Sequence, residues 1–452
     1  MKSSWKLVGV LAGGMLAMVA APGPAAAAGA NGDVTFTKDV APIFRQKCEA
    51  CHRENAMAPM SLETYRQARP WARAIKAAVA SREMPPWHID KTVGLQEFKN
   101  DRSLNDAEIE TIVEWVDAGA PMGDAADMPA PAEWPEGEEW NFADQFGEPD
   151  LIIRSPAYTV PERAPDVWYR PVVPTGLTEP RWVRAIEIRP ATTNGRRITH
   201  HALAKLQQDE GLDEFNTNAP DEVDTAGLFM EWAIGKQGEL MRPNSGKLML
   251  PGSSIVWDIH YHAIGEELTD QVELAIYFYP KDVVPKYRQR LGLYHAIAGG
   301  SGGLDIPPNT VPVHQGFHVM KAAGRIENFQ PHMHLRGKAM MMEAILPDGS
   351  VRTLSHVANY QFDWHTNYVY ADDAAPLLPK GTVLRFTSWH DNTSANRDNP
   401  DPTQWVGWGD RTVDEMAHAW VNVTYMTDED YEAEVAARTA KLATSTTQEH
   451  QQ

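Results

Sequence analysis

Both cysteines of this 452-residue chain lie in one short segment, Cys48-Glu49-Ala50-Cys51-His52. Cys-x-x-Cys-His is the attachment motif of c-type haem, in which two thiols bond the porphyrin and the histidine ligates iron. The segment therefore predicts one covalently bound haem and a redox role; a chance match or a Cys-x-x-Cys redox pair is the alternative. With both thiols committed, packing and metal ligation must stabilise every other part of the chain.

A haem iron on His52 needs a second axial ligand. We predict Met84, because the following Pro85 and Pro86 stiffen its loop and because a thioether raises the potential of the iron. Three other side chains remain possible ligands: Met57, Met60 and His88.

The N-terminus has the pattern of a signal peptide. Lys2 and Lys6 precede an apolar run over residues 7–21, and four alanines end at Ala28. This pattern predicts Sec-type export from a bacterial cytoplasm, with cleavage after about Ala28, and a periplasmic or secreted protein. An uncleaved anchor is the alternative. No later segment offers about 20 consecutive apolar residues, so we expect no stable membrane insertion.

The formal net charge is −20 and the chain has no basic block. Because a nucleic-acid-binding surface must neutralise phosphates, this composition argues against nucleic acid as a partner and favours a soluble protein.

The pattern of apolar residues changes along the chain. Residues 29–123 read as a small all-α, cytochrome c-like unit, with a helix over residues 70–81 that buries Trp71, Ile75 and Val79. A linker and lead-in follow at 124–165. Strand-length apolar segments then recur, with a hairpin over residues 341–354. We expect two all-β domains (β-sandwich or jelly-roll), at 166–290 and 291–428, with a boundary near the glycine run 299–303, and a polar tail at 429–452.

The β region contains three histidine clusters: His200-His201, His260-Tyr261-His262 and His332-Met333-His334. Residues i and i+2 of a strand face the same side about 7 Å apart, so each His-x-His can direct two imidazoles at one ion. Adjacent His200 and His201 need a bulge or a strand end to do the same. Nitrogen donors with a possible thioether favour copper, and zinc is the alternative metal.

These residues carry a resemblance. The region from about Trp140 to Met426 resembles the copper type II, ascorbate-dependent monooxygenases, the family of peptidylglycine α-hydroxylating monooxygenase and dopamine β-monooxygenase. The resemblance implies one copper ion in each of two β-sandwich domains. It implies two sets of ligands: His200, His201 and His260 for the first copper, and His332, His334 and Met416 for the second.

The resemblance also implies the chemistry. A C–H bond of a small organic substrate, O2, two electrons and two protons would give an alcohol and water. The first copper would pass electrons, the second would bind O2 beside the substrate, and a solvent-filled cleft would separate them. The haem unit, which resembles bacterial cytochrome c modules, would take electrons from an upstream donor and would replace or supplement ascorbate.

This sequence departs from the family in two ways. The animal enzymes are rich in disulfides, which this chain cannot form beside its haem motif, and His262 competes with His260 as the third ligand of the first copper.

Two other functions compete with the monooxygenase. One is a haem and copper protein for electron transfer or sensing, without substrate turnover. The other is a zinc hydrolase, although no Glu or Asp general base stands beside the His-x-His in sequence. We interpret the remaining histidines of the β region as structural or as supporting the ligands: His295, His314, His318, His356, His365, His390 and His418.

Overall fold

The structure is a computed structural model that describes residues 34–449, except residues 55, 57, 133–139, 210–226, 234–235 and 237. The predicted signal peptide and the alternative haem ligand Met57 lie outside the described residues. Within them, no helix combines the length and the apolar character that crossing a bilayer requires.

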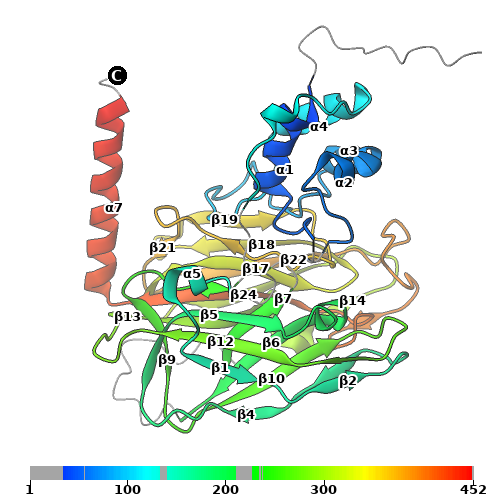
Figure 1. Cartoon of the computed structure of the whole chain (residues 1–452). Coiled ribbons are helices and arrows are strands. Elements are labelled where there is room, and N and C mark those ends of the chain that lie inside the picture. The colour runs from blue at the N-terminus through cyan, green and yellow to red at the C-terminus, as the bar shows by residue number, and fades with distance from the viewer. Residues whose placement is uncertain are drawn as a thin grey trace, which may run out of the picture.

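The described chain is mostly β-structure with several antiparallel sheets and a few helices near the N-terminus, and this confirms the predicted fold class at that level. In Figure 1 the N-terminal helices, blue to cyan, stand above the yellow strands, and the green strands lie below these.

The helices and helical turns are η1 (Phe36–Val40), α1 (Ala41–Lys47), α2 (Tyr65–Ala68), η2 (Arg69–Trp71), α3 (Ala72–Ala80), α4 (Asp106–Asp117), η3 (Ala125–Asp127), α5 (Ala143–Phe146), α6 (Gly195–Ile198), η5 (Gly300–Gly303) and α7 (Asp428–Glu449). The strands of the first β half (residues 151–278) are β1 (Leu151–Arg154), β2 (Tyr158–Val160), β3 (Val167–Tyr169), β4 (Val172–Pro174), β5 (Arg181–Pro190), β6 (Thr199–Gln207), β7 (Leu228–Ala233), β8 (Glu239–Leu240), β9 (Ser245–Met249), β10 (Ser254–Tyr261), β11 (Leu268–Asp270) and β12 (Val272–Phe278). The strands of the second β half (residues 287–426) are β13 (Tyr287–His295), β14 (Asp305–Ile306), β15 (Val313–Val319), β16 (Ala323–Ile326), β17 (Asn328–Met333), β18 (Gly337–Ile345), β19 (Val351–Val357), β20 (Tyr368–Val369), β21 (Leu377–Leu378), β22 (Val383–His390), β23 (Val406–Gly407) and β24 (Ala417–Met426).

One large sheet runs through both β halves in the order β1-β12-β5-β9-β13-β24-β16-β21, with β8, β17 and β20 attached. In the first half it faces the sheet β3-β10-β6-β7, and strands of both sheets contribute to one apolar core. In the second half it faces the sheet β15-β22-β18-β19 across a second core. The predicted hairpin is present as β18 and β19.

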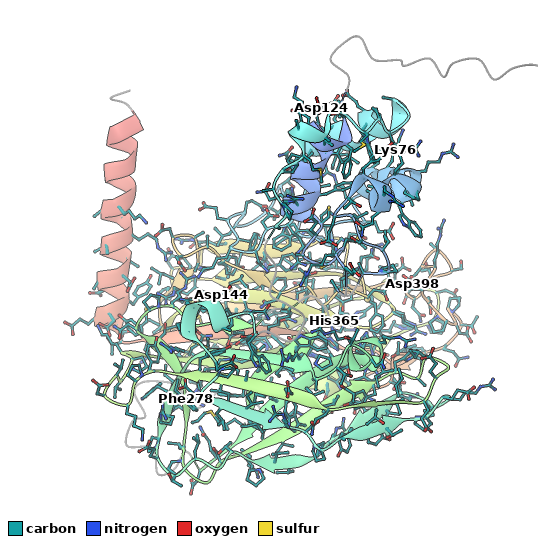
Figure 2. All side chains as sticks on the ribbon, in the orientation of Figure 1. Lys76, Asp124, Asp144, Phe278, His365 and Asp398 are labelled. Atoms are coloured by element: carbon teal, nitrogen blue, oxygen red, sulfur yellow. The ribbon has the colours of Figure 1, made fainter. Side chains whose placement is uncertain are left out.

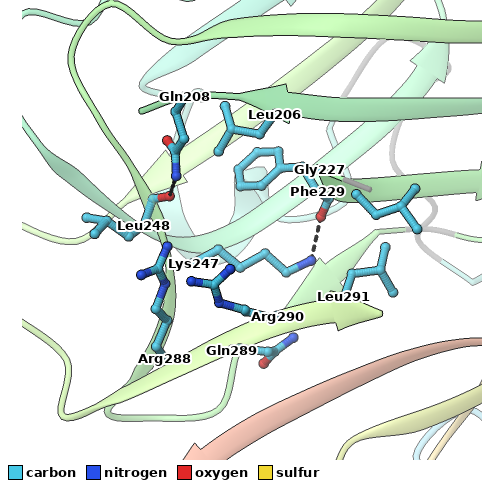
Figure 3. A pocket seen from close by; sticks show the side chains of 11 residues that line it. Leu206, Gln208, Gly227, Phe229, Lys247, Leu248, Arg288, Gln289, Arg290 and Leu291 are labelled. Carbon is cyan, nitrogen blue, oxygen red and sulfur yellow. Dashed lines mark hydrogen bonds between the residues drawn. The ribbon is translucent and has the colours of Figure 1, made fainter. Parts of the chain in front are cut away.

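Strand β13 joins the two halves. It pairs in parallel with β9 through Tyr287 and Arg288 and antiparallel with β24 along its length. The strand crosses the predicted boundary at residue 290, and the glycine run lies after it. A cavity of about 50 Å³ at this junction is lined by Lys247, Arg288 and other residues of β6, β7, β9 and β13 (Figure 3). That volume suits a water molecule, not an organic substrate.

The predicted helix over residues 70–81 begins later, as α3 at Ala72. Ile75 and Val79 are buried as expected, but the prediction for Trp71 was wrong, because it ends the preceding turn η2 and is 45% exposed. A capping box of Asn105 and Glu108 starts α4.

A segment of the predicted haem unit packs on the second β half. Trp87 and Ile89 are buried in the core of that half, and isolated bridges join Ile89 to Val357 and Phe98 to Tyr370. The helical unit is therefore tied to the β region by part of its own chain, within the range 29–123.

Candidate metal centre

The first histidine group is built on β6 and β10, which run antiparallel. His201 lies opposite His260, whereas the next partners are Thr199 and Tyr261, so the register skips His200. This is the bulge that the sequence required, since an extra residue in one strand lets neighbouring side chains point to one side.

The bulge brings three imidazoles together. One ring nitrogen each of His200, His201 and His260 lies within 4.8 Å of the others, and the Nδ1 atoms of His200 and His201 are 3.1 Å apart. The indole of Trp168 stacks on His260 at 4.3 Å between ring centroids. Because three nitrogen donors converge in a largely buried space, the group could hold a metal ion.

The structure favours His260 over His262 as the third member. His260 is 4% exposed and belongs to the group, while the His262 side chain is 67% exposed. Asp166 lies between them, with its Oδ1 3.4 Å from His260 Nε2 and 3.4 Å from His262 Nδ1. Of the two alternatives, the buried imidazole fits the group.

Burial also sets the charge of this group. Burial lowers the pKa of His200 to about 4 and lowers the pKa of His201 well below its usual value, and neighbouring imidazoles lower both further. Neutral imidazole is the form that ligates metal ions, so these rings are ready to bind near neutral pH.

The second group is placed by the pairing of β17 with β24. His332 lies opposite His418 and Met333 opposite Ala417, so continuing the register by one residue puts Met416 across from His334. Side chains alternate along each strand, and directly opposite positions are neighbours. The paired residues end at Met333 and Ala417, and His334 and Met416 are the residues that adjoin this end of the ladder. The His332 and His334 rings are 5.4 Å apart and both are buried, while Met416 is half-buried.

A buried carboxylate holds the loop before β24 against the end of β17. Glu415 is fully buried and accepts backbone N–H groups from His334 at 2.9 Å, from Arg336, and from Met416 at 3.3 Å. Burial raises the pKa of Glu415 to about 7. The sequence has no Glu or Asp beside the His-x-His, and that argued against a hydrolase; the fold brings Glu415 to His334 from a distant segment. Because these oxygens bind the backbone, Glu415 acts here as an anchor.

The two groups meet directly. The His201 and His332 ring centroids are 5.9 Å apart. The expected solvent-filled cleft between them is therefore wrong for this structure. Contacts between the halves explain the closeness: Thr412 Oγ1 donates to Asp166 Oδ2 at 3.0 Å, and an apolar cluster of Leu203, Leu228, Leu291 and Trp420 crosses the junction.

Two further histidines join the centre. His365 lies 4.6 Å from His332 and 5.4 Å from His200 between ring centroids, and His418 lies 4.8 Å from His332. No pattern in the sequence pointed to His365, which stands alone in a loop. His418 lies two residues after Met416, at strand spacing, and that position could have been recognised.

The Cys-x-x-Cys-His segment lies in the helical unit. Cys48 and Cys51 are free thiols, and burial raises the pKa of Cys48 to about 12. His52 Nδ1 lies 3.1 Å from the Met60 carbonyl oxygen, which leaves Nε2 for other use. Met84 lines a cavity of about 470 Å³ together with Val79 and residues of the α4 segment.

The other predicted iron ligands are placed differently. His88 is buried, and its backbone N–H donates to the Tyr368 hydroxyl oxygen at 3.1 Å. Met60 packs on the helical core through its side chain. Among Met84, Met60 and His88, only Met84 lines the cavity of about 470 Å³.

Comparisons with known proteins add little. No protein-family model and no curated protein matches the chain. Among solved structures, a chain from the crystal structure of the infectious bursal disease virus VP2 subviral particle is similar over 62% of this chain and 75% of that chain, with 10% identity and a TM-score of 0.18. A likeness this weak carries no argument about fold or function.

Proposed function

We propose that this protein is an exported monooxygenase that uses copper and haem to hydroxylate a C–H bond of a small organic substrate with O2. The observation that carries the proposal is the bulged triad His200, His201 and His260, with the His332 and His334 rings beside it. Met416 comes directly before β24, the strand that pairs with β17. The order and residue types of these six side chains are those that the copper monooxygenase resemblance implies. Two copper domains of β-sandwich type and a cytochrome c-like unit belong to the same proposal.

The buried nitrogens fit a metal. His260 Nδ1 and His332 Nδ1 have no hydrogen-bond partner among the described residues. A buried polar atom without a partner costs free energy, which a bound cation would offset. Donors of nitrogen and sulfur suit copper better than calcium or magnesium, which prefer oxygen.

The haem motif fits its group as well. Two unpaired thiols and an adjacent imidazole oriented by the Met60 carbonyl are the parts that c-type attachment needs. The cavity that Met84 lines has none of Cys48, Cys51 and His52 in its wall. Val79, Leu104 and Ile109 of that wall also contribute to the helical core against which Cys48 packs.

Bound copper would supply one-electron exchange and O2 activation, and bound haem would supply single electrons. The chain's own residues hold and orient these groups. Trp168 fixes the ring plane of His260, Glu415 sets the position of the His334 and Met416 backbones, and burial keeps the imidazoles neutral.

One observation favours a second candidate, a haem and copper electron-transfer protein. The two groups are in ring contact, and neither of the two cavities at 50 and 470 Å³ is lined by a histidine. An enzyme needs room for its substrate beside the metal.

Metal analysis and EPR of the haem-loaded protein test both. Two copper ions per haem with type II signals, together with O2 uptake that yields hydroxylated product, support the monooxygenase. Copper without substrate-dependent O2 uptake across a broad substrate screen supports electron transfer. Zinc in place of copper contradicts both.

A further inference from the structure

His365 occupies the space between the two histidine groups. Figure 2 shows it between the green strands of the first half and the yellow strands of the second. Its ring centroid is 4.6 Å from His332, 5.4 Å from His200 and 5.9 Å from His201. His365 is 4% exposed. It therefore contacts members of both groups from a loop that belongs to neither.

The loop that carries His365 is fixed to β17, the strand of the second group. Gln330 Nε2 donates to the His365 carbonyl oxygen at 3.1 Å, and Gln330 lies two residues before His332. Asn367, two residues after His365, accepts at its Oδ1 from Asn328 Nδ2 at 2.6 Å, and Tyr368 pairs with Phe329. Because three successive anchors hold this loop, the position of the ring follows from the fold.

The imidazole of His365 lacks a hydrogen-bond partner. Neither ring nitrogen has one among the described residues, although both are buried. The side chains around the ring are other imidazoles, Phe362 and Trp420. Burying two polar atoms in this way is costly unless a ligand meets one of them, and imidazole nitrogen is a common metal ligand.

We propose that His365 is an additional metal ligand, bound together with His332 and His334 to the ion of the second group. The inference rests on the proposed function in one respect, that the second group holds a metal. The second group is the better assignment because His332 is the nearest imidazole and because the first group already has three converging nitrogens. A third imidazole would make this site richer in nitrogen than two histidines and a methionine alone.

His418 is the matched alternative. It too is buried with two unpartnered ring nitrogens among the described residues and lies 4.8 Å from His332. Its other ring contacts are with His295, Trp408 and Trp420, away from the first group. A comparison of the two histidines therefore separates a ligand from a buried neighbour.

The test is copper titration of the metal-free, haem-loaded full chain, with a chelator competing for the ion. We compare the wild type with His365→Ala, His418→Ala and, as a peripheral control, His356→Ala. The wild type should bind two copper ions outside the haem unit. His365→Ala should leave the affinity for the first ion unchanged and lower the affinity for the second ion at least about 10-fold. His356→Ala should bind the second ion with wild-type affinity, and His418→Ala should lower that affinity less than His365→Ala does.

Wild-type affinity in His365→Ala overturns the inference and leaves the proposed function standing. If His418→Ala lowers the affinity for the second ion and His365→Ala does not, the inference is overturned and His418 is the ligand. Failure of the wild type to bind a second ion overturns the proposed function as well, and this appears before any variant is made.

A second measurement does not depend on the folding of a His365 variant. In His201→Ala protein, whose first group is broken, one bound Cu(II) should show couplings to three imidazole nitrogens by pulsed EPR. Couplings to two overturn the inference.

Discussion

The two histidine groups use the same kind of side chain but are completed by different features of the β-sheets. In the first group a bulge at His200 turns adjacent residues toward His260 on the next strand. In the second group, regular pairing of β17 with β24 places His332 opposite His418, and the buried Glu415 holds the backbone of His334 to the loop before β24. The first group is complete within one sheet. The second depends on a loop anchor and lies next to spare imidazoles, so we expect it to be easier to perturb.

The largest expected effect is the response of both groups to acid. In the unfolded chain these imidazoles take up protons near pH 6.5, whereas burial lowers the native pKa of His200 and His334 to about 4. The unfolded state then binds more protons below pH 6.5, so the stabilising contribution is complete above that pH and is lost as the pH falls toward 4. For each such group, a tenfold difference between the folded and unfolded acid dissociation constants corresponds to about 1.4 kcal/mol of unfolding free energy.

Glu415 opposes this trend, because its native pKa of about 7 lies above its usual value and it contributes stability that is lost as the pH rises toward 7. Several imidazoles outweigh one carboxyl. Urea unfolding of the metal-free protein should therefore show lower stability at pH 5 than at pH 7.5. Equal stability at the two pH values contradicts the neutral, buried state of the rings.

The second effect comes from the charged residues that hold the halves together. Lys236 is 4% exposed in its side chain, pairs with Glu231 and Glu239, and reaches Gln330 of β17 at 3.4 Å. Lys236→Met leaves the buried Glu231 without its cation, although Glu239 keeps its pair with Lys247 at 2.7 Å, and should cost about 3–5 kcal/mol. Lys281→Met breaks an exposed pair with Glu179 and should cost less than about 1 kcal/mol. Chemical denaturation compares the two variants; similar losses contradict the role given to Lys236.

The third effect tests the first group alone. His260→Ala removes one of three converging nitrogens and should weaken the first metal at least about 100-fold, beyond the loss expected for residues that only support a ligand. His262→Ala, which alters an exposed side chain two residues away, should leave affinity unchanged. Competition titrations with copper measure both. A larger loss in His262→Ala reverses the assignment.

The smallest effect separates the groups. Glu415→Gln keeps the shape of the side chain but replaces one backbone-accepting oxygen by an amide donor, which disturbs the positions of His334 and Met416. Affinity for the second metal should fall about 10–100-fold while that for the first stays the same. Titration of both sites gives the comparison, and equal losses at the two sites contradict the local role of Glu415.

Much of the architecture follows from local sequence patterns. Alternation and turn residues predicted the mostly-β region and the β18–β19 hairpin. Trp71 shows where local reasoning failed: helical spacing placed it on the buried face, but the turn before α3 has a different period and exposes it.

The sequence alone determined which side chains carry the proposed chemistry. It supplied the Cys-x-x-Cys-His segment, the paired histidines, and the condition that His200 and His201 could share a site only at a bulge or a strand end. These are properties of neighbours along the chain, because spacing of one or two residues fixes the side to which a strand directs its side chains.

Only the tertiary structure decided where the two histidine groups lie relative to each other. His365, His418, Glu415 and Asp166 enter the centre from separate loops and strands, and the contact of His201 with His332 depends on two halves that share one sheet. No local pattern records such contacts, because they arise from the packing of segments that are far apart in the sequence. Buried charges and the apolar cluster at the junction fix that packing, and they place an isolated loop histidine between the two groups.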